Sequence, residues 1–78
     1  MPRFYFHIRG GEDPVDDDIG VEFKDRIAAL KHAEQAARDM LSDLAQEGEP
    51  VRDDAIEIVD EAGGVVGRLR LRDTLRLT

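Results

Sequence analysis

The chain of 78 residues contains no cysteine and has a formal net charge of −7 at pH 7. The absence of cysteine excludes a disulfide framework and a thiolate metal site, and makes a reducing, cytoplasmic compartment the natural expectation. Because its apolar runs are short, the sequence offers neither a membrane span nor the apolar core of a signal peptide, and its length fits one domain over residues 1–78.

The first predicted element is a strand over Arg3–Arg9, where apolar and polar side chains alternate with a period of two. One face of this strand is expected to pack on a core through Phe4, Phe6 and Ile8. Gly10 and Gly11 end the strand, since glycine pairs poorly in a sheet and permits turn conformations. After an acidic loop, a short antiparallel strand is predicted over Ile19–Phe23.

A long amphipathic helix is predicted next, with Asp25 as its N-cap and its end near Glu47. At helical spacing the apolar side chains cover an arc of about 180°, wider than the stripe of a minimal surface helix. This arc is rich in alanine and comprises Ala29, Leu30, Ala33, Ala36, Ala37, Met40, Leu41 and Leu44. The polar face is expected to carry Lys31, His32, Gln35, Arg38, Asp39 and Ser42, and Gly48 and Pro50 end the helix.

Two further strands are predicted over Ala55–Asp60 and Val65–Arg72, joined by a tight turn in which Gly63 or Gly64 is left-handed. The order β-β-α-β-β indicates an α+β domain, a four-stranded antiparallel sheet with one amphipathic helix packed on one face. A right-handed crossover favours the strand order 2-1-3-4, although the order 2-1-4-3 satisfies the same patterns.

Four segments of the chain together carry a family resemblance: Met1–His7, Asp18–Phe23, Asp60–Gly63 and Leu71–Leu75. They resemble, over essentially the whole chain, a family of very short bacterial proteins known as domain of unknown function 6894. The resemblance implies a stand-alone protein with no assigned activity, so no catalytic residue is carried over. The chain departs from the family where Gly64 and Gly67 are expected to loosen the second hairpin and where Leu71 replaces an aromatic residue.

No motif in the sequence indicates catalysis, a metal or a cofactor. A calcium loop beginning at Asp16 would need a glutamate at its twelfth position, which is Ile27, so Asp16–Asp18 is interpreted as a solvated acidic turn. His7 and His32 lack the spacing of a two-histidine metal site. Ser42 is the one serine and belongs to no recognisable triad, so we expect that the protein is not an enzyme.

The most distinctive local feature is an arginine row at two-residue spacing near the end of the chain. The row and the polar side of the first strand are expected to share one face of the sheet, formed by Arg68, Arg70, Arg72, Arg3, Tyr5, His7 and Arg9. Such a face is typical of proteins that hold single-stranded nucleic acid. The alternative that we favour is protection of an edge strand, with Glu57 neutralising part of the row, because the negative net charge repels polyanions.

These features favour a non-catalytic protein-interaction or regulatory module that forms a homodimer. Its contacts would involve the wide helix arc and the apolar residues near the end of the chain, with Met40, Leu75 and Leu77 as the candidates for self-association. The alternative function is a nucleic-acid-associated regulator that binds anions through Arg68, Arg70, Arg72, Tyr5, His7 and Arg9. No membrane association is expected.

Overall fold

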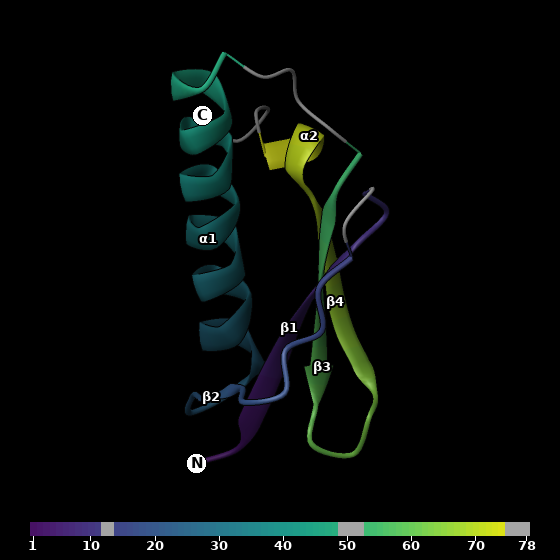
Figure 1. Ribbon diagram of the computed structural model, residues 1–78. Helices are drawn as coiled ribbons and strands as arrows, with labels where there is room; N and C mark the ends of the chain where they lie inside the picture. The colour runs from purple at the N-terminus through teal and green to yellow at the C-terminus, as the bar shows by residue number, and fades with distance from the viewer. Residues whose placement is uncertain (12–13, 49–52, 75–78) are drawn as a thin grey trace.

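The computed structural model describes residues 1–11, 14–48 and 53–74. Four antiparallel strands form one sheet in the order β2-β1-β3-β4. The strands are β1 (Arg3–Arg9), β2 (Val21–Glu22), β3 (Ala55–Asp60) and β4 (Val65–Arg70). The helix α1 (Arg26–Gln46) runs along one face of the sheet (Figure 1). The predicted fold class and the favoured strand order are confirmed, and the order 2-1-4-3 is wrong.

The second strand is much shorter than predicted. β2 pairs with the start of β1. Near the other end of β1, an isolated bridge joins Ile8 to Val15. Between these two points the backbone N–H of Phe6 donates to the carboxylate of Asp17 at 3.1 Å instead of to a strand partner. The prediction of a strand over Ile19–Phe23 is therefore wrong in its length, because a side chain replaces part of the backbone ladder.

The ends of α1 follow the predicted capping residues. The carboxylate of Asp25 accepts a hydrogen bond of 2.9 Å from the backbone N–H of Ala28, which satisfies one free donor of the first turn. At the other end Gly48 adopts the left-handed conformation with φ +72°. Pro50 lies outside the described residues. In the described part of the chain, no helix combines the length and the hydrophobicity needed to cross a bilayer.

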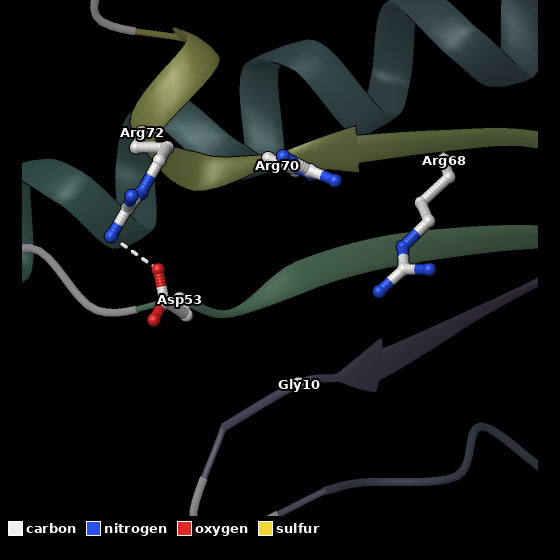
Figure 2. A pocket seen from close by; sticks show the side chains of 5 residues that line it. All are labelled: Gly10, Asp53, Arg68, Arg70 and Arg72. Carbon is white, nitrogen blue, oxygen red and sulfur yellow. Dashed lines mark ion pairs between the residues drawn. The ribbon is translucent and has the colours of Figure 1, made fainter.

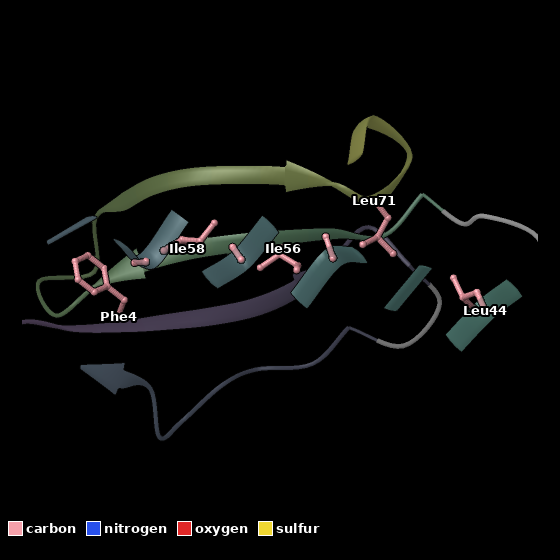
Figure 3. Packing of buried hydrophobic residues seen from close by; sticks show 8 residues of the cluster. Phe4, Leu44, Ile56, Ile58 and Leu71 are labelled. Atoms are coloured by element: carbon pink, nitrogen blue, oxygen red, sulfur yellow. The ribbon is translucent and has the colours of Figure 1, made fainter. Parts of the chain in front are cut away.

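The core lies between α1 and the sheet and consists of small helix residues opposite large strand residues (Figure 3). Ala29, Ala33 and Ala37 are fully buried on the helix. Ile56 and Ile58 from β3 are buried opposite them, and Phe4 from β1 closes one end of the core. The alanines let the helix axis approach the sheet closely, and the larger strand side chains fill the space between them.

An aromatic cluster covers the side of the core next to β2. The ring of Phe23 lies 6.4 Å from that of Phe4 and 6.0 Å from that of Phe6, in tilted and edge-on arrangements. The ring of His32 lies 5.1 Å from both Phe6 and Phe23. His32 is exposed, as expected for the polar face of the helix, but its ring also packs against these two phenylalanine rings.

Gly67 lies beside an irregularity of β4 and is also a packing position. It pairs with Ile58, and a β-carbon added at Gly67 would lie 2.5 Å from Cδ2 of Leu30 on α1. The missing side chain thus gives Leu30 room to pack against the strand. A register shift follows at once, because Val59 pairs with Val65 and leaves Val66 as the extra residue of a bulge.

The last predicted strand ends two residues early. The backbone N–H of Leu71 donates to the carbonyl oxygen of Asp54 at 3.0 Å, and the chain then forms a short helix, α2 (Leu71–Thr74). Leu71 and Thr74 are both fully buried, because their three-residue spacing places them on the same side of the helical turn. The prediction that the strand extends to Arg72 is therefore wrong, because α2 begins at Leu71.

Candidate functional site

The face of the sheet that turns away from α1 is built by three strands in register. His7, Glu57 and Arg68 form one cross-strand row, and Arg9, Ala55 and Arg70 form the next. Because side chains alternate along a strand and the intervening residues face the helix, these rows point away from the core. The register thus brings the polar side of β1 and two of the three predicted arginines onto one surface.

Arg3 and Tyr5 on β1 are engaged by the chain that borders this strand, which we call the edge segment (residues 14–22). Nη1 of Arg3 donates to the carbonyl oxygens of Ile19 at 2.9 Å and Gly20 at 3.3 Å, and Nη2 of Arg3 pairs with Glu22 at 3.3 Å. Tyr5 lies so close to Gly20 that an added β-carbon there would be 3.0 Å from Cε1 of the ring.

His7 and Arg9 contact the same edge segment. The backbone N–H of Asp17 donates to Nδ1 of His7 at 3.0 Å, and Nη2 of Arg9 pairs with the Asp16 carboxylate at 2.7 Å. All four outward side chains of β1 therefore hold the edge segment. This half of the predicted anion-binding face performs a structural task.

Asp17 connects the edge segment to the sheet. One carboxylate oxygen accepts the N–H of Phe6 at 3.1 Å, and the other accepts those of Ile19 at 3.1 Å and Gly20 at 3.0 Å. Burial alone would raise the pKa of Asp17, but these hydrogen bonds favour the charged form more strongly and lower the pKa below its ordinary value of 3.8. The prediction of a solvated acidic turn applies only to the exposed neighbours, Asp16 and Asp18.

The other half of the face forms a half-open cavity of about 310 Å³, shown in Figure 2, which we call the arginine cavity. Its lining residues come from the ends of β1 and β4, from the turn before β3 and from α2: Gly10, Asp53, Arg68, Arg70 and Arg72. Gly10 has φ +83°, and a β-carbon there would lie 2.8 Å from the carbonyl oxygen of Asp53. A residue without a side chain thus lets these two segments meet at the cavity.

Arg72 reaches the arginine cavity from α2. Although the chain leaves the sheet after Arg70, the first turn of α2 keeps Arg72 near its strand neighbours, and its side chain turns toward Asp53 (Figure 2). The Arg72 guanidinium and the Asp53 carboxylate form an ion pair, and both side chains remain more than half exposed. The three arginines therefore line one cavity, although Arg72 lies on α2 and not on β4.

Arg68 and Arg70 differ from Arg72 in their partners. Among the described residues, neither of their side chains makes a hydrogen bond or an ion pair. Glu57 is the cross-strand neighbour of Arg68, as the sequence analysis expected, but no ion pair joins the two side chains. Two exposed guanidinium groups thus face the cavity with their donors available to a ligand.

The candidate residues for self-association are only partly described. Met40 is half-buried, packs against the core and lines a smaller cavity of about 200 Å³ together with Asp43, Leu44 and Glu47. Leu75 and Leu77 lie outside the described residues. Apolar side chains are instead exposed along the edge segment, where Val15 and Ile19 are 54% and 80% accessible and Val21 on β2 is 45% accessible.

Within residues 1–11, 14–48 and 53–74, no group of three histidine, aspartate or glutamate side chains is arranged to hold a metal ion. The two histidines have separate environments, His7 at the edge segment and His32 on the aromatic cluster. Sequence reasoning missed Gly10 and Asp53 as parts of the cavity. The glycine pair after β1 and the acidic pair before β3 were visible, but only the pairing of Arg9 with Ala55 places them side by side.

A model of the family described as domain of unknown function DUF6894 matches residues 3–72, and the chain therefore belongs to this family. The match covers both halves of the outer sheet face and ends at Arg72, the last arginine of the cavity. No curated protein and no solved structure gives a significant match.

Proposed function

We propose that this member of the DUF6894 family is a non-catalytic binding module that holds an acidic group of a partner protein in the arginine cavity. The observation that carries the proposal is the convergence of Arg68, Arg70 and Arg72 on one cavity from two different elements. A chain with a net charge of −7 has few basic clusters, and a cluster with unpaired guanidinium groups suits a carboxylate or another anion.

A protein partner is favoured over nucleic acid by the state of β1. Stacking of bases would need the rings of Tyr5 and His7 to turn toward a ligand, but both residues are half-buried and held by the edge segment, Tyr5 beside Gly20 and His7 by a hydrogen bond from Asp17. The negative net charge also repels a polyanion at long range, whereas a short acidic segment can approach the local cluster. Nucleic-acid binding remains the alternative that the experiment below also measures.

Two features of the sequence support a non-catalytic role and a cytoplasmic location. The absence of an acid–base or nucleophile motif supports a binding role rather than catalysis. The absence of cysteine supports a cytoplasmic location.

The proposal is tested by fluorescence anisotropy with a labelled glutamate-rich peptide and with a labelled single-stranded DNA. The parent protein should bind the peptide at low salt, and affinity should fall as added salt screens the charges. The double variant Arg68→Gln/Arg70→Gln should lose this binding. The matched control Arg26→Gln/Arg38→Gln, which removes the same charge from α1, should retain it.

Equal binding by the two double variants would show that only net charge matters and would contradict the proposal. A parent that binds no acidic peptide would favour the competing account, in which the arginines protect the β4 edge. In that case the Arg68→Gln/Arg70→Gln variant should aggregate more readily than the parent. Tighter binding of the DNA than of the peptide would favour the nucleic-acid alternative.

Self-association is a second candidate function, and the exposed apolar residues of the edge segment favour it. Val15, Ile19 and Val21 lie along one border of the sheet, so a second copy could cover all three. Sedimentation velocity should then report a dimer whose fraction rises with protein concentration. Ile19→Lys should shift the equilibrium toward the monomer, and a parent that sediments as a monomer at every concentration would contradict this candidate.

A further inference from the structure

We propose that the acidic group recognised by the arginine cavity is a phosphomonoester dianion on a side chain of the partner, and that Asp53 competes with it for Arg72. This inference rests on the proposed function and deepens it. It selects one anion from the several that an arginine cluster can bind.

The charge balance of the cavity favours a dianion. Three guanidinium groups and one carboxylate line it, so its own side chains carry a net charge of +2. A single carboxylate from a ligand would leave one positive charge uncompensated, whereas a phosphomonoester carries a charge of about −1.5 to −2 at neutral pH. The cavity and a phosphoryl group thus neutralise each other.

The geometry of the donors favours a group with several oxygens. Arg68 and Arg70 are two residues apart on β4, which places their side chains on one face about 7 Å apart at the backbone. Figure 2 shows Arg68 reaching over β3 while Arg72 approaches from the opposite end of the cavity. A tetrahedral phosphoryl group presents oxygens in several directions and can accept from more than one guanidinium fork, whereas a planar carboxylate has two oxygens.

The position of the cavity favours a ligand group carried on a chain. The cavity is half-open and is bordered by β4, which is the last strand of the sheet. An extended partner segment running beside β4 can place a side chain over Arg68 or Arg70 without being enclosed. A free small ligand would be expected to need a more enclosed pocket.

Asp53 is an internal competitor for the ligand. Its carboxylate pairs with Arg72 and therefore occupies, from within the protein, a position that a ligand oxygen would take. A weak monoanionic ligand competes poorly with this internal carboxylate, whereas a dianion attracts Arg72 more strongly. Removing the Asp53 charge should therefore strengthen the binding of both kinds of ligand, and of the dianion by at least as large a factor, because the Asp53 carboxylate repels a dianion more strongly than a monoanion.

The test uses three labelled peptides of one sequence that carry phosphoserine, glutamate or serine at one position, with the full-length protein. The phosphoserine peptide should bind about tenfold more tightly than the glutamate peptide, a ratio equivalent to about 1.4 kcal/mol, and the serine peptide should bind least. Asp53→Asn should increase affinity for both peptides, and for the phosphoserine peptide by at least as large a factor as for the glutamate peptide. The matched control Asp18→Asn, which removes the same charge at an exposed position of the edge segment, should leave both affinities unchanged.

Competition by free phosphoserine and by inorganic phosphate identifies the source of the phosphoryl group. Both should displace the phosphopeptide only at concentrations well above that of the unlabelled peptide, because the partner chain adds contacts. Displacement by free phosphate as effectively as by the peptide would overturn the assignment to a partner side chain. Equal affinity for the glutamate and phosphoserine peptides would overturn the phosphoryl assignment but leave the proposed binding function intact, whereas a parent that binds none of the peptides would contradict both.

Discussion

The carboxylate of Asp17 accepts a hydrogen bond of 3.1 Å from the backbone N–H of Phe6, at the point where the edge of β1 has no strand partner. The same carboxylate accepts the N–H groups of Ile19 and Gly20, so one side chain joins the edge segment to the sheet. Its neighbours Asp16 and His7 add contacts to Arg9 and to the backbone of Asp17 itself. The edge segment is thereby held against β1.

Replacing Asp17 by alanine should therefore destabilise the fold. The substitution leaves three backbone donors without their charged acceptor, and hydrogen bonds to charged groups contribute about 1.5–3 kcal/mol. Urea denaturation followed by circular dichroism measures the change in the free energy of unfolding. The control Asp18→Ala, at an exposed position, should change it by about 0.5 kcal/mol or less, and equal effects of the two substitutions would contradict this role of Asp17.

The contribution of Asp17 should also depend on pH. Its pKa is lower in the folded protein than the ordinary value of 3.8, so folding favours the charged form. The stabilisation is fully present above the pKa of the unfolded chain and is lost as the pH falls through the lower folded pKa. The difference in the free energy of unfolding between the parent and Asp17→Asn should thus shrink as urea titrations move from neutral pH to below 3.8. A difference that is constant over this range would contradict the lowered pKa.

Gly67→Ala should destabilise the packing of α1 on β4. The new methyl group would overlap Cδ2 of Leu30, and overpacking typically destabilises a protein by about 1–3 kcal/mol. The matched test is the same substitution in a Leu30→Ala background, where the overlap is gone and the effect should largely disappear. An effect of equal size in both backgrounds would show that the overlap with Leu30 is not its cause.

Phe4→Ala should lower stability more than Phe6→Ala. Phe4 is 4% exposed and closes one end of the core, whereas Phe6 is half-buried within the aromatic cluster. Emptying a buried phenylalanine site destabilises by about 3–5 kcal/mol, which approaches the whole stability of a small domain. Thermal melts of the two variants should show this order, and the reverse order would contradict the placement of Phe4 in the core.

Most of the fold could be predicted from the sequence because it depends on periodic patterns. The alternation in β1, the alanine-rich arc of α1 and the N-cap at Asp25 each specify a local structure and the face it buries. The short helix α2 was not predicted, because Leu71 and Arg72 continue the apolar–polar alternation of β4 in the sequence. Only the end of its partner strand at Ala55 shows that the ladder stops there.

The candidate site was predicted only in part, for a similar physical reason. Alternation placed the arginines and the polar residues of β1 on one face, but it carries no information about which side chains are already engaged. The contacts of His7 and Arg9 with the edge segment depend on how an irregular loop folds back. The meeting of Gly10 with Asp53 depends on strand register, which the sequence of either segment alone does not specify.

The binding role of the arginine cavity is tested most directly by amide chemical shifts in two-dimensional NMR spectra of the protein during titration with the glutamate-rich peptide. The account predicts shift changes concentrated at the residues that line the cavity: Gly10, Asp53, Arg68, Arg70 and Arg72. The amides of residues 15–22 in the edge segment should remain unchanged, because their contacts with β1 are internal. Changes confined to the edge segment, or no change at the cavity at saturating peptide, would contradict the proposed function.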